Sequence, residues 1–345
     1  MNSLQCLLLG ILLTLFFGTN YYIYNYSFDM SKDKMKASIV DMTKQDVVQK
    51  NYPSVLNFGD VMFDRGVRNI IENRGRDPFE YIKRDFDFID KFDIIIANLE
   101  GPIVEMDRNE CQQKAYNFQF ASTTPELLKT IGINMVNIAN NHSRDCFSVG
   151  YESTKQYLKQ FGISYIGDQE LEESYRLVMV NDKRMAFVGI DQTISPALTD
   201  KAYALIKKLD SENDYIVVNI HWGEEYKLEA NSTQIDIAHK LIDNGADVIF
   251  GHHPHVVEPM EIYKGKMVFY SLGNFVFDQN FGDTTVGLGV GVEFQDSKSV
   301  YTLFPFNIKV FAPEFMVGDE RTVFCEKYLK SLNPAGCSFE ITPIS

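Results

Sequence analysis

A histidine-rich segment, "GHHPHVVEP" at residues 251–259, places three of the chain's six histidines within four positions. The segment directly follows the mostly apolar run 246–250, which has the composition of a buried strand. Imidazoles at this density need their charge and desolvation compensated, and a bound metal ion does both. His252, His253 and His255 are therefore candidate metal ligands.

Four other expected strands also end in polar side chains. These residues are Asp60, Asn98 and Glu100, Asn140 to His142 with Asp145, and His221. In open α/β sheets ligands bind at the carboxyl ends of the strands, so five such ends should bring these side chains together. Carboxylate, amide oxygen and imidazole are the ligands of hydrolytic divalent-metal sites, and a bridging carboxylate can hold two cations. The pattern predicts a phosphoesterase-like metal site.

Each of these residues alone also fits an ordinary structural role. The roles are a turn cap at Asp60, a solvated loop at Glu100, left-handed turns at Asn140 and Asn141, a helix cap at His142 and a hydrogen-bonded histidine at His221. The coincidence of five strand ends favours a site over these separate roles. His239 lies in the amphipathic stretch "IDIAHKL" and is expected outside the site.

The elements that would position the site follow an α/β pattern. From about Ser54, strand-like runs alternate with helical patterns. Two alternating runs flank Asn181-Asp182, as in a hairpin. After Met260 the chain is β-rich to about Phe311, which suggests a second, more antiparallel sheet, and residues 318–332 have a helical pattern. We expect a two-sheet α/β domain flanked by helices over 54–317, with a helical extension over 318–345.

The amino-terminal 28 residues contain no charged side chain and have the length of a membrane-spanning helix. Tyrosines follow the apolar run where an interfacial belt would lie, and Lys32, Lys34 and Lys36 come next. A cleaved signal peptide is the alternative, but a basic amino-terminal region and a small-residue cleavage site are missing. We expect an anchor at 1–28 and a tether at 29–53. The lysines alone would place the domain in the cytoplasm.

Charge and cysteine content restrict the partners and leave the redox state open. The net charge of −14 argues against nucleic acid as a partner, because a polyanion repels an acidic surface. Beyond Cys6 in the expected anchor, four cysteines fit either disulfides or free thiols. Cys325 and Cys337 are the favoured bridge because they are close in sequence.

Six motifs resemble those of the poly-γ-glutamate capsule synthesis proteins of the CapA and PgsA type, in the calcineurin-like metallophosphoesterase superfamily. They are "GDVMFDRGV", "NLEGPI", "NIANNHSRD", "HWGEEY", "GHHPHVVEPMEIYKG" and "YSLGNFVFDQ". The resemblance extends from about Val55 to Phe311. It implies the superfamily's two-sheet fold, and a membrane segment followed by an extracytoplasmic domain at the cell membrane.

The resemblance also implies roles for individual residues. The implied ligands of divalent cations (Mn, Fe, Zn or Mg) are Asp60, Glu100, Asn141, His221, His253 and His255. His142 would protonate a leaving group. The superfamily has D-x-H in its first motif, whereas this chain has Met62, so one cation loses an imidazole. His252 also fits the first position of the H-x-H pair.

The function implied is capsule synthesis or export, in which an acidic domain would have to attract an anionic polymer. Attraction for that polymer would come from the cations and from a local basic group such as Arg65 and Arg68. A non-catalytic accessory subunit of a polymer synthase complex is the competing hypothesis. A metal-dependent phosphoesterase unrelated to capsule is a third, since fold does not fix function.

Overall fold

The computed structural model describes residues 52–167, 174–194, 196–329 and 336–342. Strand β1 (Ser54–Val61) lies in the middle of the first sheet, whose order is β14-β13-β12-β1-β2-β3-β4. Strand β11 also pairs with β1, and β15 pairs with β13. The other strands are β2 (Ile94–Leu99), β3 (Met135–Asn137), β4 (Ser164–Ile166), β11 (Asn274–Val276), β12 (Val286–Gln295), β13 (Lys298–Lys309), β14 (Ala312–Phe315) and β15 (Ser338–Ile341).

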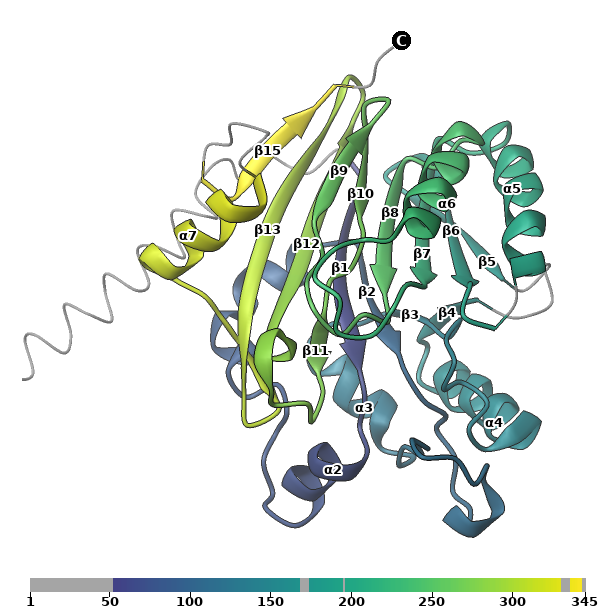
Figure 1. Ribbon diagram of the computed structural model, residues 1–345, viewed down its shortest axis with the longest axis vertical. Coiled ribbons are helices and arrows are strands. Elements are labelled where there is room, and N and C mark those ends of the chain that lie inside the picture. The colour runs from purple at the N-terminus through teal and green to yellow at the C-terminus, as the bar shows by residue number, and fades with distance from the viewer. Residues whose placement is uncertain (1–51, 168–173, 195, 330–335, 343–345) are drawn as a thin grey trace, which may run out of the picture. The chain divides into compact units, whose positions relative to one another are not determined.

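The second sheet has the order β5-β6-β7-β8-β10-β9 (Figure 1). Its strands are β5 (Tyr175–Val180), β6 (Lys183–Asp191), β7 (Tyr215–His221), β8 (Val248–His252), β9 (Met260–Tyr263) and β10 (Lys266–Phe269). β5 and β6 form the expected hairpin, in which Val180 pairs with Lys183. Asn181 and Asp182 both have positive φ, at 47° and 62°, as a two-residue hairpin turn requires.

Apolar side chains from both sheets fill the space between them. Val55 and Ile96 of the first sheet share this core with Val217 and Phe250 of the second. Because side chains alternate along a strand, Phe58 of β1 faces the other side, where its ring stacks on Phe275 with centroids 4.1 Å apart. The expected two-sheet α/β arrangement is confirmed.

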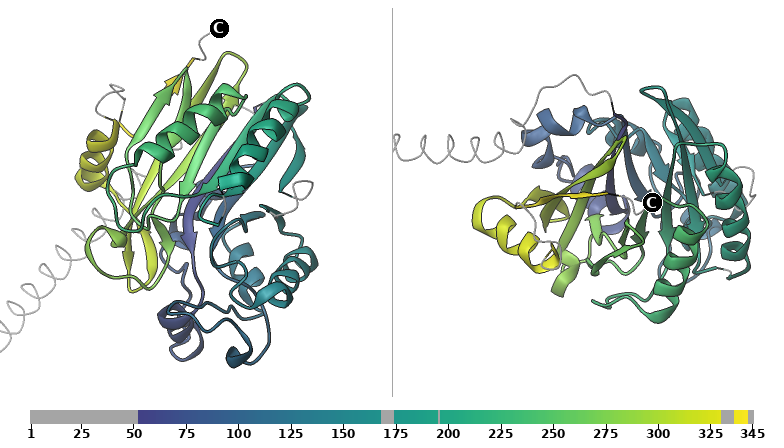
Figure 2. Two further views of the ribbon diagram at one scale, coloured as in Figure 1. Left: turned by 45° about the vertical axis from the view of Figure 1, so that its right-hand side comes forward. Right: turned by 90° about the horizontal axis from the view of Figure 1, so that it is seen from above.

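Helices cover the second sheet on its outer face. Leu205 and Ile206 of α5 (Pro196–Asp210) and Leu241 of α6 (Ser232–Asp243) pack with Val188 and Val218 of that sheet. Figure 2 shows the two helices in teal and green beside the sheet. The remaining α-helices are α2 (Arg65–Glu72), α3 (Thr124–Lys129), α4 (Phe147–Gln160) and α7 (Gly318–Leu329), and the 3-10 helices are η1 (Ile82–Lys91), η2 (Arg108–Glu110) and η3 (Gly282–Thr285).

The division of strands between the sheets differs from the expectation. We expected the alternating part of the chain to form one sheet and the β-rich part after Met260 to form another. Instead, β12 pairs with β1, so the carboxyl-terminal antiparallel strands extend the first sheet, and the second sheet starts at the hairpin. Pairing partners so distant in sequence are set by tertiary packing, whereas periodicity reports only the type of each element.

Two disulfides lie in the described part of the chain. Cys325 of α7 and Cys337 before β15 form the bridge that sequence proximity favoured. Cys111 and Cys146 form the second, joining the loop after η2 to the start of α4. Among the described residues, no helix has the length and apolar composition needed to cross a bilayer. The anchor expected at 1–28 lies outside those residues.

Candidate metal centre

The carboxyl ends of β1 and β8 meet at the candidate site. The Asp60 carboxylate at the end of β1 is fully buried, and its Oδ2 accepts a hydrogen bond from the His253 backbone N–H at 3.3 Å. A Cβ added at Gly59 would lie 1.9 Å from the Gly273 carbonyl oxygen, so only glycine lets β1 approach that backbone. The Asp60 N–H donates to the same oxygen at 3.0 Å, which fixes its position.

Glu100, directly after β2, provides a second fully buried carboxylate. Within the described part of the chain, neither of its oxygens accepts a hydrogen bond. The closest imidazole nitrogens, His255 Nε2 and His142 Nε2, lie 3.7 and 3.9 Å from Oε1. Burial raises the pKa of Glu100 well above its usual value, against the opposing effect of His255. An uncompensated buried carboxylate is costly, and a bound cation would remove that cost.

His255 is placed between the two carboxylates. Its Nδ1 donates to Asn274 Oδ1 at 2.9 Å and lies 3.2 Å from Asp60 Oδ2, which leaves Nε2 facing Glu100. Burial lowers the pKa of His255, but the charges of Glu100 and Asp60 outweigh it and raise the pKa to about 9. For Asp60, hydrogen bonds from His252 and His255 outweigh burial and lower the pKa well below its usual value.

A third ligand group lies at the ends of β7 and β3. His221 Nε2 donates to Asn141 Oδ1 at 3.0 Å, so the two expected ligand atoms are neighbours. The His221 ring lies 4.7 Å from that of His253, whose ring lies 6.1 Å from His255. Burial lowers the pKa of His221 well below its usual value, and burial lowers that of His253 to about 4. Neutral imidazoles of this kind are the form that binds metal.

His252 points away from this group. It is fully buried, its Nε2 donates to Asn219 Oδ1 at 3.1 Å, and its Nδ1 lies 3.5 Å from Asp60 Oδ1. The structure therefore places His253 with His221 and His255, and places His252 beneath Asp60. His239 lies elsewhere, stacked on Tyr263 with ring centroids 3.7 Å apart, as expected.

His142 faces Glu100 while a carboxylate holds its other nitrogen. Nδ1 donates to Asp145 Oδ2 at 2.8 Å, and the ring packs on Phe118 with centroids 4.1 Å apart. Asp145 also accepts from the Phe118 backbone N–H at 2.7 Å and pairs with Lys114 Nζ at 2.5 Å. Burial lowers the pKa of His142, against the raising effect of Asp145. This arrangement leaves Nε2 to carry a proton at the site.

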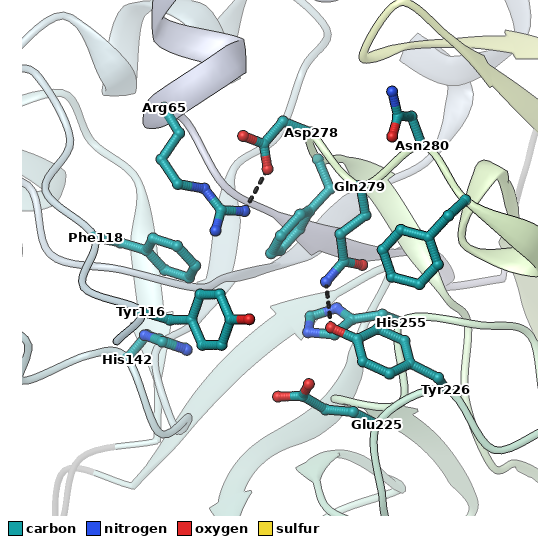
Figure 3. A pocket seen from close by; sticks show the side chains of 12 residues that line it. Arg65, Tyr116, Phe118, His142, Glu225, Tyr226, His255, Asp278, Gln279 and Asn280 are labelled. Atoms are coloured by element: carbon teal, nitrogen blue, oxygen red, sulfur yellow. Dashed lines mark hydrogen bonds and ion pairs between the residues drawn. The ribbon is translucent and has the colours of Figure 1, made fainter. Parts of the chain in front are cut away.

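A cavity of about 430 Å³ opens over His142 and His255 (Figure 3). Its rim carries three exposed aromatic side chains, Tyr116, Tyr226 and Phe281. Arg65, expected to bind an anionic substrate, also lines it. The Arg65 guanidinium forms an ion pair with Asp278 and lies 4.9 Å from the Phe118 ring centroid, so much of its charge is already neutralised. Arg68 is not among the lining residues and pairs instead with Asp64 at 3.3 Å.

Two residues contribute to the site in ways that the sequence did not predict: Asn98, expected there but with no role assigned, and Glu225, for which no place in the site was expected. Asn98 donates to Asp60 Oδ1 at 2.8 Å, and its Nδ2 lies 3.3 Å from His221 Nδ1, so one amide orients two candidate ligands. The Glu225 carboxylate groups with His253 and His255, with all three ligand atoms within 4.8 Å of one another. Asp60, Glu100 and His255 form a second group by the same measure. In the sequence, Glu225 was indicated only by its place in the motif "HWGEEY".

The chain is similar to proteins named for capsule synthesis. The family model described as bacterial capsule synthesis protein PGA_cap matches residues 54–279. Capsule biosynthesis protein CapA of Bacillus anthracis is 30% identical over 280 residues, which is 74% of this chain and 67% of that protein. PGA biosynthesis protein CapA of Bacillus subtilis is 33% identical over 246 residues, which is 66% of this chain and 63% of that protein.

The chain thus spans about two thirds of the length of these curated relatives. Among solved structures, a hypothetical protein from Thermus thermophilus is 16% identical, with a TM-score of 0.45. That match covers 77% of this chain and 98% of the other.

Proposed function

The chain belongs to the family of bacterial capsule synthesis proteins, and from that premise we propose that it acts in poly-γ-glutamate capsule synthesis or export through a divalent-metal centre. The observation that carries the metal centre is the Glu100 carboxylate, which is fully buried and accepts no hydrogen bond within the described residues. It lies beside Asp60 and His255 in a group with ligand spacing. Carboxylate and imidazole groups of this kind are the metal ligands expected in a calcineurin-like metallophosphoesterase.

The residues that would hold cations are Asp60, Glu100, Asn141, His221, His253 and His255. Nitrogen and oxygen donors together suit Mn, Fe, Zn or Mg, with the imidazoles favouring the first three. A cation bound there supplies Lewis-acid polarisation of a phosphoryl or carbonyl oxygen. His221 Nε2 and Asn141 Oδ1 are hydrogen-bonded to each other, so these two candidate metal-ligand atoms already lie close together.

His142 is proposed as the group that delivers a proton to the leaving atom. Its Nδ1–H is held by Asp145, so the ring orientation is fixed and Nε2 is directed to the cavity. The Asp145 carboxylate would stabilise the imidazolium form, in which Nε2 carries the proton to be delivered. Positioned proton transfer of this kind typically contributes about a hundredfold or more in rate. The same ring packs on Phe118, which keeps it from rotating away from Glu100.

The cavity suggests an extended anionic substrate. Arg65 provides a cationic group at the rim, and Tyr116, Tyr226 and Phe281 provide exposed rings for the apolar part of a chain. Because the protein carries a net charge of −14 and Asp278 neutralises much of the Arg65 charge, an anionic polymer would depend mainly on bound cations for attraction. Poly-γ-glutamate is the proposed polymer, and nucleic acid is not proposed as a partner.

A membrane anchor at 1–28 and an extracytoplasmic domain are further parts of the proposal. The uncharged segment supports the anchor, and the two disulfides support an oxidising compartment outside the cytoplasm. Protease added to intact cells should remove the domain and leave a short membrane-bound fragment. Complete protection of the domain would place it in the cytoplasm and overturn this topology.

A non-catalytic accessory role is the second candidate, and Met62 is the observation that favours it. Met62 is fully buried, and its sulfur lies 3.0 Å from the Asp64 backbone nitrogen, so it does not supply the ligand of a D-x-H motif. In this alternative the domain assembles capsule synthase subunits, and any metal serves structure.

Capsule yield and bound metal together separate the two candidates. Cells lacking the protein would be complemented at equal level with wild type, Glu100→Gln, or the exposed control Glu105→Gln. The purified proteins would be analysed for metal and screened on phosphoester and γ-glutamyl substrates. The metal-dependent hypothesis predicts loss of metal and capsule in Glu100→Gln alone. Normal capsule in metal-free Glu100→Gln cells would leave the accessory role.

A further inference from the structure

Glu225 lies in the loop after β7, four positions beyond His221, and no motif role was expected for it. Its carboxylate and the imidazoles of His253 and His255 each place one ligand atom within 4.8 Å of the others. Figure 3 shows the Glu225 carboxylate beside His255, facing across the cavity towards His142. One carboxylate and two imidazoles form a donor set that suits Zn²⁺, Mn²⁺ or Fe²⁺.

The backbone joins the loop that carries Glu225 to the loop that carries the two histidines. The Trp222 N–H donates to the His252 carbonyl at 3.1 Å, and the Tyr226 N–H donates to the Pro254 carbonyl at 2.8 Å. Pro254 lies between His253 and His255, so these bonds fix Glu225 against the pair. Tyr226 adopts a left-handed φ of 65°, a conformation typical of turns.

The two imidazoles have the nitrogen atoms that such a site needs. His255 donates its Nδ1–H to Asn274, so Nε2 is the atom left to bind on the cavity side. His253 Nδ1 is buried and has no hydrogen-bond partner among the described residues. Glu100 Oε1 lies 3.7 Å from the same Nε2 of His255, which makes the two candidate groups neighbours.

We propose that Glu225 is a metal ligand that, with His253 and His255, holds a second cation of the centre. The assignment rests on the proposed divalent-metal centre. The second cation would then not depend on an imidazole at position 62, because Glu225 supplies a ligand from the cavity side. The second cation would then lie at the cavity wall beside Tyr226, where it would contact an anionic substrate directly.

The test is Mn²⁺ binding to the full-length protein in detergent, after removal of bound metal with a chelator. Equilibrium dialysis would measure the equivalents bound and their affinities, and electron paramagnetic resonance would report whether two Mn²⁺ ions interact. Wild type would be compared with Glu225→Gln and with the neighbouring exposed control Glu224→Gln. Thermal unfolding of the metal-free proteins would confirm that each variant is folded.

We expect wild type and Glu224→Gln to bind two equivalents with an interacting spectrum. Glu225→Gln should bind one tightly, with the second weakened at least about tenfold and the interaction lost. Unchanged second-site binding in Glu225→Gln would overturn the assignment. Equal weakening in Glu224→Gln would also overturn it, since it would show a general charge effect. Wild type that binds no Mn²⁺ would instead refute the metal centre itself.

Discussion

Removing the Cys111–Cys146 disulfide should both destabilise the protein and loosen its proposed proton donor. The two cysteines are 35 residues apart, and a bridge that closes a loop of this length stabilises by about 4 kcal/mol at 25 °C. Cys146 follows Asp145, which accepts hydrogen bonds from His142 and from the Phe118 backbone. The bridge therefore holds together the loop and the helix start that orient His142.

A matched control separates these two effects. The Cys325–Cys337 bridge spans 12 residues, for which the same relation gives about 3 kcal/mol, and neither cysteine lines the cavity. Urea unfolding of the two double-alanine variants would give the stability losses, and an NMR titration would follow the His142 ring. Both variants should be less stable, but only the first should change the His142 titration. A loss below about 1 kcal/mol in the first variant, or an unchanged His142, would refute the reasoning.

Two further predictions concern the centre of the site. His142→Ala should keep its metal but slow turnover by about a hundredfold, because the ring is proposed to carry a proton rather than to bind the metal. Its Nε2 lies 3.9 Å from Glu100 Oε1, within reach of the centre. Loss of the metal in this variant would contradict this role. In metal-free protein the pKa of His255 is raised from 6.5 to about 9, which stabilises the fold by about 3 kcal/mol below pH 6.5 and is lost as the pH rises through 9. Thermal unfolding curves of wild type and His255→Gln should therefore converge between these pH values, and a constant difference would refute this account.

Element types could be predicted from the sequence because their periodicity is local. The Asn181-Asp182 hairpin, α6 and the strand that ends at His221 all follow from patterns within a few residues. The partners of β1 could not be predicted in this way, since β12 pairs with β1 across more than half of the chain. β15 was missed because it is only a short strand beyond α7.

The candidate ligands could be recognised as strand-end residues, but their mutual contacts could not. His253 and His255 adopt left-handed φ values of 99° and 60°, so their directions depend on a loop conformation that no periodicity predicts. Glu225 lies in an exposed acidic loop, where a charged residue usually needs no special explanation. Its role emerges only from the backbone hydrogen bonds that bring its loop to the histidines.

A buried polar chain explains why the site depends on the packing of the two sheets. Asn57 of the first sheet donates to Asn219 Oδ1 of the second at 2.7 Å, and His252 donates to the same oxygen at 3.1 Å. The other nitrogen of His252 lies 3.5 Å from Asp60. The position of Asp60 is thus tied to the second sheet, which carries the candidate histidine ligands. Local sequence patterns identify each candidate ligand on its own strand, whereas the proposed centre can form only when the two sheets pack in this register.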